Sequence, residues 1–386
     1  NKTLTWKSEY YSTRGRIMAN QNIRTPKFYP DLIGYHRGRG SAIGAVTATD
    51  AGTNFVGLPS DKTVADLLDL KPLNLVTFDT SADTDGHVLC TFAFSTASHK
   101  QNYIAILNHN LATSIGKIRV FAGNAASDVT ALNGANVDTT DPDTDAEWNN
   151  ITTTEVVNAD NINVASGNKS VVVTPLTDGT TVIKFTEKNL RYWAIQFEGN
   201  LQADASVGTG SENDRVWGST DFTLGGIMIG ESFEMPFSPD LELSRNITYD
   251  KVKIQESVGG QRYASATNLG RTGGSASKSP FSLATNAQKV YGGRITYDLN
   301  FSFLNSSELL PVESNTYVYT DDTVVSDIWN MTDGPTRPFI FCIDKDTAAD
   351  GAESDFMFAR FGQDSLTMTQ VAHDHYNVSM RIEEEF

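Results

Sequence analysis

Short runs in which apolar and polar side chains alternate restrict the fold of this chain more than any other feature of its sequence. The runs begin near residue 70, are rich in Val, Ile, Thr, Phe and Tyr, and end at Gly, Asn, Asp or Ser. Such runs are typical of β-strands separated by turns. The predicted strands are 88–94, 103–107, 117–122, 171–174, 181–186, 192–198, 226–229, 294–304, 339–343, 356–361 and 376–383.

The alternation is clearest in 117–121 and 191–197, where it predicts one buried face and one solvent-exposed face. We expect hairpin turns at Asp178-Gly179 and Gly292-Gly293, since Gly-containing pairs suit tight hairpins. The sequence therefore predicts strands that pair in antiparallel fashion and cover a core with one side.

Helical patterns are scarce. The best is 62–70, which Ser60 or Asp61 would cap, and 321–331 and 306–310 are weaker candidates. Nowhere does a strand alternate with a helix of ten residues or more, so a parallel nucleotide-binding sheet is not expected. We predict a mainly β protein.

A chain of 386 residues is long for a single hydrophobic core, so we expect two domains. The polar segments 123–168 and 199–220 are predicted to be loops, the first with at most one short strand. The segment 236–243 contains Pro236 and Pro239 and is predicted to be a linker. The predicted divisions are a basic N-terminal arm (1–45), a first β domain (46–235) and a second β domain (236–386).

The net charge of −17 is unevenly distributed. The total argues against a duplex nucleic-acid partner, which would need clustered Lys and Arg. Residues 1–40 have a net charge of +6, which leaves −23 for the remainder. A basic arm on an acidic body suits binding to an identical neighbour, and protein lacking residues 1–40 would then fold without assembling. A solvated tail and a nucleic-acid-binding arm are the alternatives. The charged residues of this segment are Lys2, Lys7, Glu9, Arg14, Arg16, Arg24, Lys27, Asp31, Arg37 and Arg39.

Several features bear on the compartment of the protein. Its apolar stretches are too short to cross a bilayer, so no membrane insertion is expected, and no secretory signal is evident. The chain begins at Asn1, and Met18 is a plausible initiator, so the true N-terminus stays open. Cys90 and Cys342 lie far apart in apolar strand-like runs, and we interpret them as buried free thiols in preference to a disulfide.

Candidate metal ligands are few. His373 and His375 form the one close histidine pair, and on a strand both would reach one metal ion, whereas a loop before Tyr376 is the alternative. The acidic segments 344–353 and 138–145 lack the spacing of a calcium-binding EF-hand, so solvated loops are the better interpretation. We assign no metal ligand.

Signatures of catalysis are missing from the sequence. No nucleophile elbow, phosphate-binding loop or dinucleotide fingerprint is present, and nothing places two carboxylates across a cleft. We therefore assign no catalytic residue and no cofactor-binding residue, and we expect no cofactor.

Aromatic side chains offer another kind of site. Alternation places one of Tyr192 and Trp193 in the core and the other outward. Trp148, Trp217 and Trp329 fall in or near predicted loops, where they would stack on a sugar ring or, more commonly, pack in a core or an interface.

Two stretches together resemble structural proteins of tailed bacteriophages. Residues 102–111 are an apolar strand ending in His109-Asn110-Leu111, and a second strand follows at 116–121. This pattern is similar to that of a discoidin-like, galactose-binding-like jelly roll. The resemblance implies that 192–199 and 225–230 are closing strands, and that His109 and Asn110 tie a strand end through hydrogen bonds.

The C-terminal half looks similar to phage tail or baseplate proteins. The features that carry this resemblance are a Gly-Gly-Arg start at 292–294, a long strand ending at 301–304, Arg337-Pro338 before 339–341, and a terminal strand at 376–384. The resemblance covers residues 75–235 and, more loosely, 245–386. Residues 24–29 look like an extended arm.

These observations together predict a jelly-roll-like β-sandwich, a second β domain and an extended N-terminal arm. The expected function is that of a non-enzymatic virion structural protein of the phage tail or baseplate. Its expected partners are copies of itself and other virion proteins, with a host-surface glycan as a further candidate. The alternatives are a carbohydrate-binding module or adhesin acting as a monomer, and a glycan-cleaving enzyme.

Overall fold

The chain folds as a mainly β protein, as expected, and every strand pairing in the described parts is antiparallel. No helix in these parts is both long and apolar enough to span a membrane. The computed structural model describes residues 25–40, 45–46, 56–82, 87–94, 100–126, 153–163, 171–201, 215–248, 252–265, 294–309, 324–343 and 356–385.

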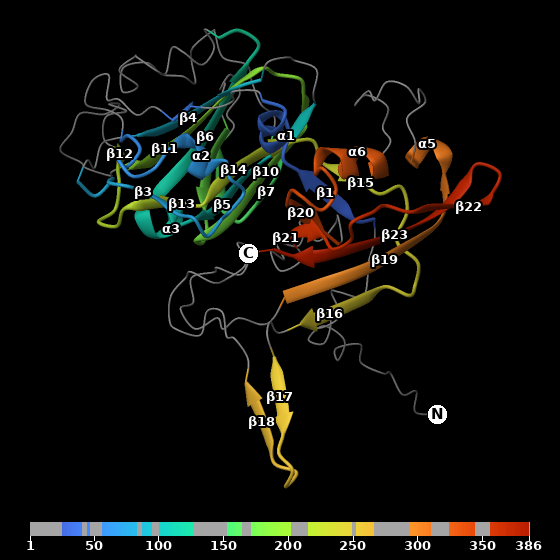
Figure 1. The fold of residues 1–386 in the computed structure, drawn as a ribbon. Helices are drawn as coiled ribbons and strands as arrows, with labels where there is room; N and C mark the ends of the chain where they lie inside the picture. The colour runs from blue at the N-terminus through green and yellow to red at the C-terminus, as the bar shows by residue number, and fades with distance from the viewer. Residues whose placement is uncertain are drawn as a thin grey trace, which may run out of the picture.

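Two sheets face each other across a shared core in the upper part of the molecule (Figure 1). The first has the order β2-β4-β11-β6-β9-β8, with β12 beside β11, and the second has the order β14-β5-β10-β7. The strands of the first are β2 (Ala45–Val46), β4 (Val88–Ala93), β6 (Gly116–Gly123), β8 (Ala159–Asn163), β9 (Val171–Pro175), β11 (Tyr192–Leu201) and β12 (Arg215–Val216). The strands of the second are β5 (Gln101–His109), β7 (Thr153–Val157), β10 (Gly179–Lys188) and β14 (Gly226–Gly230).

An eight-stranded sheet forms the other large part of the fold. Its order is β15-β1-β20-β21-β23-β19-β16, and β22 also pairs with β23. Helices α5 (Ser306–Leu309) and α6 (Val324–Met331) pack on it, and the ring of Trp329 lies 5.0 Å from that of Phe361. The strands are β1 (Lys27–Pro30), β15 (Phe233–Glu234), β16 (Ser244–Thr248), β19 (Arg294–Asn305), β20 (Phe339–Cys342), β21 (Phe356–Phe361), β22 (Met368–Ala372) and β23 (His375–Glu384).

The four-stranded sheet is buried on both faces, and strand β5 shows why. Its Ile104 and Ile106 lie in the sandwich core, whereas Tyr103 and Leu107 lie in a second core. That second core also contains Tyr29, Ile340 and Phe358 of the eight-stranded sheet. A strand that is buried on both faces needs apolar residues at consecutive positions, which explains the unbroken apolar run of β5.

The segment 25–40 is packed into the fold, which corrects the expectation of an arm for this part of the chain. Strand β1 lies between β15 and β20, and helix α1 (Leu32–Gly38) follows it. Phe28 is fully buried against the rings of Phe339 and Phe341. Deleting residues 1–40 would therefore remove an inner strand, and residues 1–24 of the predicted arm lie outside the described residues.

Sequence and structure agree on all eleven predicted strands and on the three helical segments. The segment 123–168, predicted to be a loop with at most one short strand, instead contains two strands, β7 and β8. Helix α2 (Val64–Leu67) is capped by Thr63, not by Ser60 or Asp61, and the Thr63 amide donates to Asp66 Oδ2 at 2.8 Å. Asp178 lies in the bend between β9 and β10, and Gly179 begins β10; because these two strands belong to different sheets, no hairpin forms. Gly292-Gly293 lies outside the described residues.

The prediction of a solvent-exposed face at 117–121 and 191–197 is wrong. Arg119, Phe121 and Gln196 point away from the sandwich core and are nevertheless buried. The polar groups on this face pair with one another, and Arg119 Nε lies 2.9 Å from Glu198 Oε1. Alternation therefore predicted the strands correctly, although it does not tell an exposed polar face from a buried, internally paired one.

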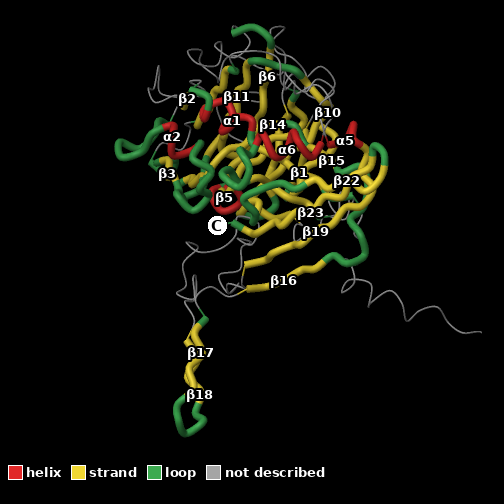
Figure 2. The backbone as a smooth tube through the Cα atoms, turned by 45° about the vertical axis from the view of Figure 1, so that its right-hand side comes forward, coloured by secondary structure: helices red, strands yellow, loops and turns green. Residues whose placement is uncertain are grey.

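A two-stranded hairpin extends away from both large parts of the fold (Figures 1 and 2). It consists of β17 (Lys253–Glu256) and β18 (Arg262–Ser265), and it follows the edge strand β16 after a short connection. Every side chain from 252 to 264 is exposed. Because a lone hairpin is only marginally stable in water, its exposure is a feature that calls for an explanation.

Candidate functional site

The end of β5 holds a buried histidine, His109. His109 Nδ1 accepts a hydrogen bond from the Leu111 amide at 3.2 Å, so the proton of the neutral ring is on Nε2. Nε2 donates to Thr181 Oγ1 at 2.8 Å. Burial lowers the pKa of His109 to about 3, so the ring is neutral at pH 7 and serves as a structural connection.

Asn110 fastens the same strand end to a small sheet of β3 (Val76–Phe78) and β13 (Phe222–Leu224). Its Oδ1 accepts from the Thr223 amide at 2.7 Å, and its Nδ2 donates to the Asp221 carbonyl at 2.7 Å. The expectation that His109 and Asn110 tie a strand end through hydrogen bonds is confirmed.

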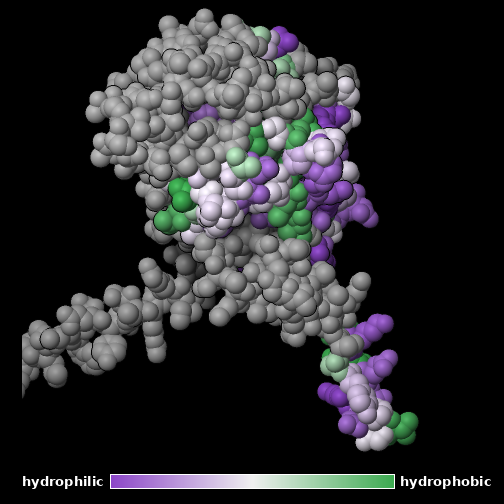
Figure 3. Space-filling view, turned by 90° about the vertical axis from the view of Figure 1, so that its left-hand side faces the viewer, coloured by the Kyte–Doolittle hydropathy of each residue, from purple (hydrophilic) through white to green (hydrophobic). Residues whose placement is uncertain are grey.

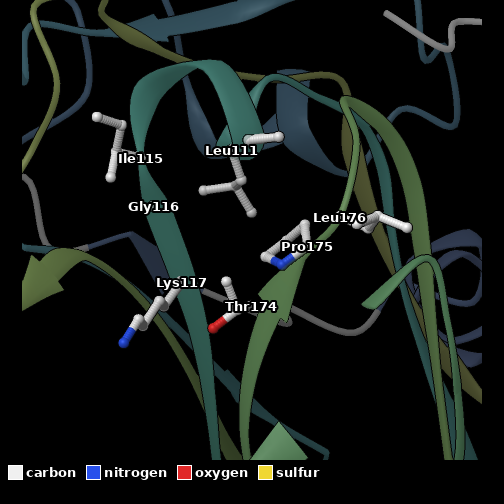
Figure 4. Close-up of a pocket in the computed structure, with 8 residues that line it drawn as sticks. Leu111, Ile115, Gly116, Lys117, Thr174, Pro175 and Leu176 are labelled. Atoms are coloured by element: carbon white, nitrogen blue, oxygen red, sulfur yellow. The ribbon is translucent and has the colours of Figure 1, made fainter. Parts of the chain in front are cut away.

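A pocket of about 230 Å³ lies beside this strand end, between the start of β6 and the end of β9 (Figure 4). Leu111, Pro175 and Leu176 give it an apolar lining. Helix α3 (Leu111–Ser114) ends at Ile115, which has a φ of 60° and is half exposed. A β-branched residue is strained at that φ. The pocket could hold a small apolar group, and none of its lining residues is acidic.

A buried polar cluster lies on the outer face of the seven-stranded sheet. Glu198 accepts from Arg119 Nε at 2.9 Å and from Gln196 Nε2 at 3.2 Å, and that amide also lies 3.4 Å from His87 Nδ1. The Gln196 Oε1 atom is buried and has no hydrogen-bond partner among the residues that the structure describes. The carboxylate and guanidinium neutralise each other, so the arrangement is that of a buried ion pair.

Of the histidine pair considered for metal binding, His373 lies in the turn between β22 and β23, and His375 begins β23. The His373 side chain is almost fully exposed beside Asp374, and the His375 ring packs against Phe303 at 6.4 Å. Within the described ranges, no three His, Cys, Asp or Glu side chains gather in a way that would hold a metal ion. The acidic segments 344–353 and 138–145 lie outside those ranges.

The tryptophans and cysteines that the structure describes belong to the packing of the fold. Trp193 is fully buried, Trp217 is buried and stacks on Phe222, and Trp329 packs on Phe361. Cys90 and Cys342 are buried free thiols, as predicted, and burial raises the pKa of Cys90 to about 12. Trp148 lies outside the described residues.

Exposed apolar side chains are concentrated in one segment of the chain, residues 237–263. Of the eleven large hydrophobic side chains that are exposed in the described parts, seven lie between residues 237 and 263. The side chains of Val258 and Leu241 are fully exposed. Figure 3 shows the hairpin, with its hydrophobic and hydrophilic side chains, standing clear of the body. The seven are Phe237, Leu241, Ile247, Val252, Ile254, Val258 and Tyr263.

Sequence reasoning missed this surface, because it treated 236–243 as a linker and passed over the hairpin. The sequence does contain a pattern that predicts this hairpin. The segment 252–258 alternates apolar and polar residues and is followed by Gly259-Gly260 and a second short run. That is the pattern of two strands joined by a tight turn. Strand β16 is one outer strand of its sheet and leads directly toward the hairpin.

Comparisons with known proteins do not identify this chain. No protein-family model matches it, no curated protein matches it, and no solved structure matches its fold.

Proposed function

We propose that this chain is a non-enzymatic structural protein of the virion of a tailed bacteriophage, a tail or baseplate component that assembles with copies of itself and with other virion proteins. The observation that carries the proposal is the concentration of exposed apolar side chains at 237–263. Large apolar side chains exposed in such number mark protein–protein contact sites. The outer strand β16 adds to it, because among the described strands it pairs only with β19, and an open sheet edge accepts another strand.

The strand order supports a jelly roll for the sandwich. From β4 to β11 the chain passes between the two sheets repeatedly, so that β4, β6, β8, β9 and β11 lie in one and β5, β7 and β10 in the other. Apart from the consecutive pair β8 and β9, neighbours within each sheet along this stretch are not consecutive in the chain, as in a jelly roll. The stretch that resembles phage structural proteins forms β5, α3 and β6 within this sandwich. The phage assignment itself rests on that resemblance.

The alternatives receive less support from the described residues. A monomeric carbohydrate-binding module would present tryptophans as an open platform, yet Trp217 and Trp329 are packed against Phe222 and Phe361. A glycan-cleaving enzyme would need two carboxylates about 5 to 10 Å apart in one groove. A sugar array tests the first alternative, and hydrolysis of glycan substrates tests the second.

Light scattering of the purified protein at two salt concentrations tests the proposal. We expect a mass that is a multiple of the 42.1 kDa chain mass. Raising the salt from about 0.1 M to about 1 M should lower it, because charge contacts between copies are screened over that range. A mass of one chain at both salt concentrations and at high protein concentration would contradict the proposal.

A further inference from the structure

The two faces of the hairpin differ in chemistry. Ile254 pairs with Ala264 across the hairpin, and Glu256 pairs with Arg262 two residues further along. Side chains two residues apart on a strand point to the same face, so all four share one face of the ribbon. We call these four residues the paired face. Ile254 is 66% exposed there, and Arg262 Nε lies 3.4 Å from Glu256 Oε2.

The opposite face lacks such a pattern. It carries Lys253 opposite Ser265 and Gln255 opposite Tyr263. The Tyr263 hydroxyl donates to Gln261 Oε1 at 3.0 Å, so its polar end is already satisfied within the hairpin. A single lysine with no acidic residue on the same face offers nothing for an identical face to match.

We propose that the paired face is a self-association surface, on which a second copy of this chain places the same face about a two-fold axis parallel to the hairpin. The inference rests on the proposed function and names one of its contacts. A rotation about that axis brings β17 of one copy over β18 of the other. It therefore places Ile254 over Ala264 of the second copy, and Glu256 over Arg262 of the second copy.

Charge complementarity selects this partner and this arrangement. Both contacts occur twice, because the two-fold axis makes the interface self-complementary. If the axis instead ran across the hairpin, β17 would face β17 in the reverse direction, so Glu256 would lie over Glu256 or over Ile254 of the second copy and not over Arg262. Like charges at that position would oppose association. Burying Ile254 and Ala264 would also cover apolar groups that the hairpin cannot cover alone.

The test uses two charge reversals in the full-length chain, Glu256→Arg and Arg262→Glu. Each places four like charges at the contact, so we expect the dissociation constant for self-association to rise about tenfold for either one alone, since each exposed pair contributes modestly. When the two variants are mixed in equal amounts, a mixed dimer places the two arginines of one copy over the two glutamates of the other. We expect the mixture to return to within about threefold of the wild-type value, measured by sedimentation or light scattering.

The mixture of the two variants distinguishes a contact between copies from an interaction within one chain. Within each variant the hairpin still holds two like charges, so a role confined to one chain would not be rescued by mixing. Lys253→Glu is the matched control, because it makes the same change of charge as Arg262→Glu on the opposite face. It should leave the association within about twofold of wild type. All variants should keep the wild-type melting temperature, because the hairpin is exposed throughout.

Two results would overturn the inference: self-association of either single variant at wild-type strength, or a mixture that dissociates as readily as its components. In both cases the wild-type chain still assembles and the proposed function stands. If the wild-type chain instead stays monomeric at all salt and protein concentrations, both the proposed function and this inference are wrong.

Discussion

At the scale of single residues, two buried titratable groups give the fold opposite responses to pH. Burial lowers the pKa of His109 to about 3 and raises the pKa of Asp31 to about 6. The unfolded chain holds the two groups near 6.5 and 3.8. Between about pH 4 and pH 6 the unfolded state therefore binds more protons at His109, whereas the folded state binds more at Asp31.

Replacing His109 with Gln should remove one source of acid sensitivity. The lowered folded-state pKa contributes stability that is present above about pH 6.5 and is lost as the pH falls toward about 3. We expect His109→Gln to unfold more easily at pH 7 by about 1 to 3 kcal/mol, because the bonds to Thr181 and Leu111 are disturbed. Its stability should then fall less than that of wild type between pH 7 and pH 4.5, measured by urea unfolding. Parallel pH profiles would contradict the assignment.

The substitution Asp31→Asn should act in the other direction. Asp31 caps α1 through the Ile33 and Gly34 amides, and its Oδ1 also accepts from the Ile229 amide of β14 at 3.3 Å. Because burial raises its folded-state pKa, the associated stability is present below about pH 3.8 and is lost as the pH rises through about 6. We expect the variant to gain on wild type by up to about 3 kcal/mol between pH 4 and pH 7. Urea unfolding at both pH values measures the change, and an unchanged difference would refute it.

Some residue roles could be predicted from the sequence, whereas roles that depend on distant contacts could not. The role of His109 and Asn110 was implied by the resemblance of residues 102–111 to phage structural proteins, and it fits the need of a strand end for partners for its polar groups. Asp31 before an apolar segment was an available cap signal. Its bond to Ile229 depends on a residue 198 positions away, and no local pattern contains that information. The strained backbone of Ile115 is equally invisible in the sequence.

At the scale of elements, β1 shows where local reasoning fails. Its four residues follow a basic segment and end at Pro30, which made an extended arm the natural interpretation. The structure uses that extended shape as an inner strand, which Phe233 and Glu234 flank on one side and β20 on the other. A strand that short has no periodicity to recognise, so only its distant partners define it.

Replacing Phe28 with Ala tests the place of β1 in the core. Phe28 is fully buried, and its ring lies 5.6 Å from that of Phe339 and 5.2 Å from that of Phe341. We expect the free energy of unfolding to fall by about 3 to 5 kcal/mol, the usual effect of removing a buried aromatic ring. Ile254→Ala in the exposed hairpin is the control, with an expected change within about 0.5 kcal/mol. A mild effect of Phe28→Ala would restore the arm interpretation for this segment.

At the scale of the whole molecule, the predicted boundary near residue 235 separates strands that share one sheet. β1 and β15 precede the boundary and pair within the sheet that β19 to β23 complete. Tyr103 of the sandwich donates to the Pro30 carbonyl at 2.8 Å, next to the second core. The chain order suggested two consecutive domains, but shared strands and a shared core couple the two parts physically.

This coupling predicts that the two parts unfold together. Separate domains would give two heat-capacity peaks, and a core substitution would shift only the peak of its own domain. With a shared sheet and a shared core, Phe28→Ala in the eight-stranded sheet and Val120→Ala in the seven-stranded sheet should both shift one common peak downward. Differential scanning calorimetry of the two variants and wild type measures this. If each variant shifted a different peak, the four-stranded sheet between the two parts would not couple their unfolding, and the two predicted domains would be independent.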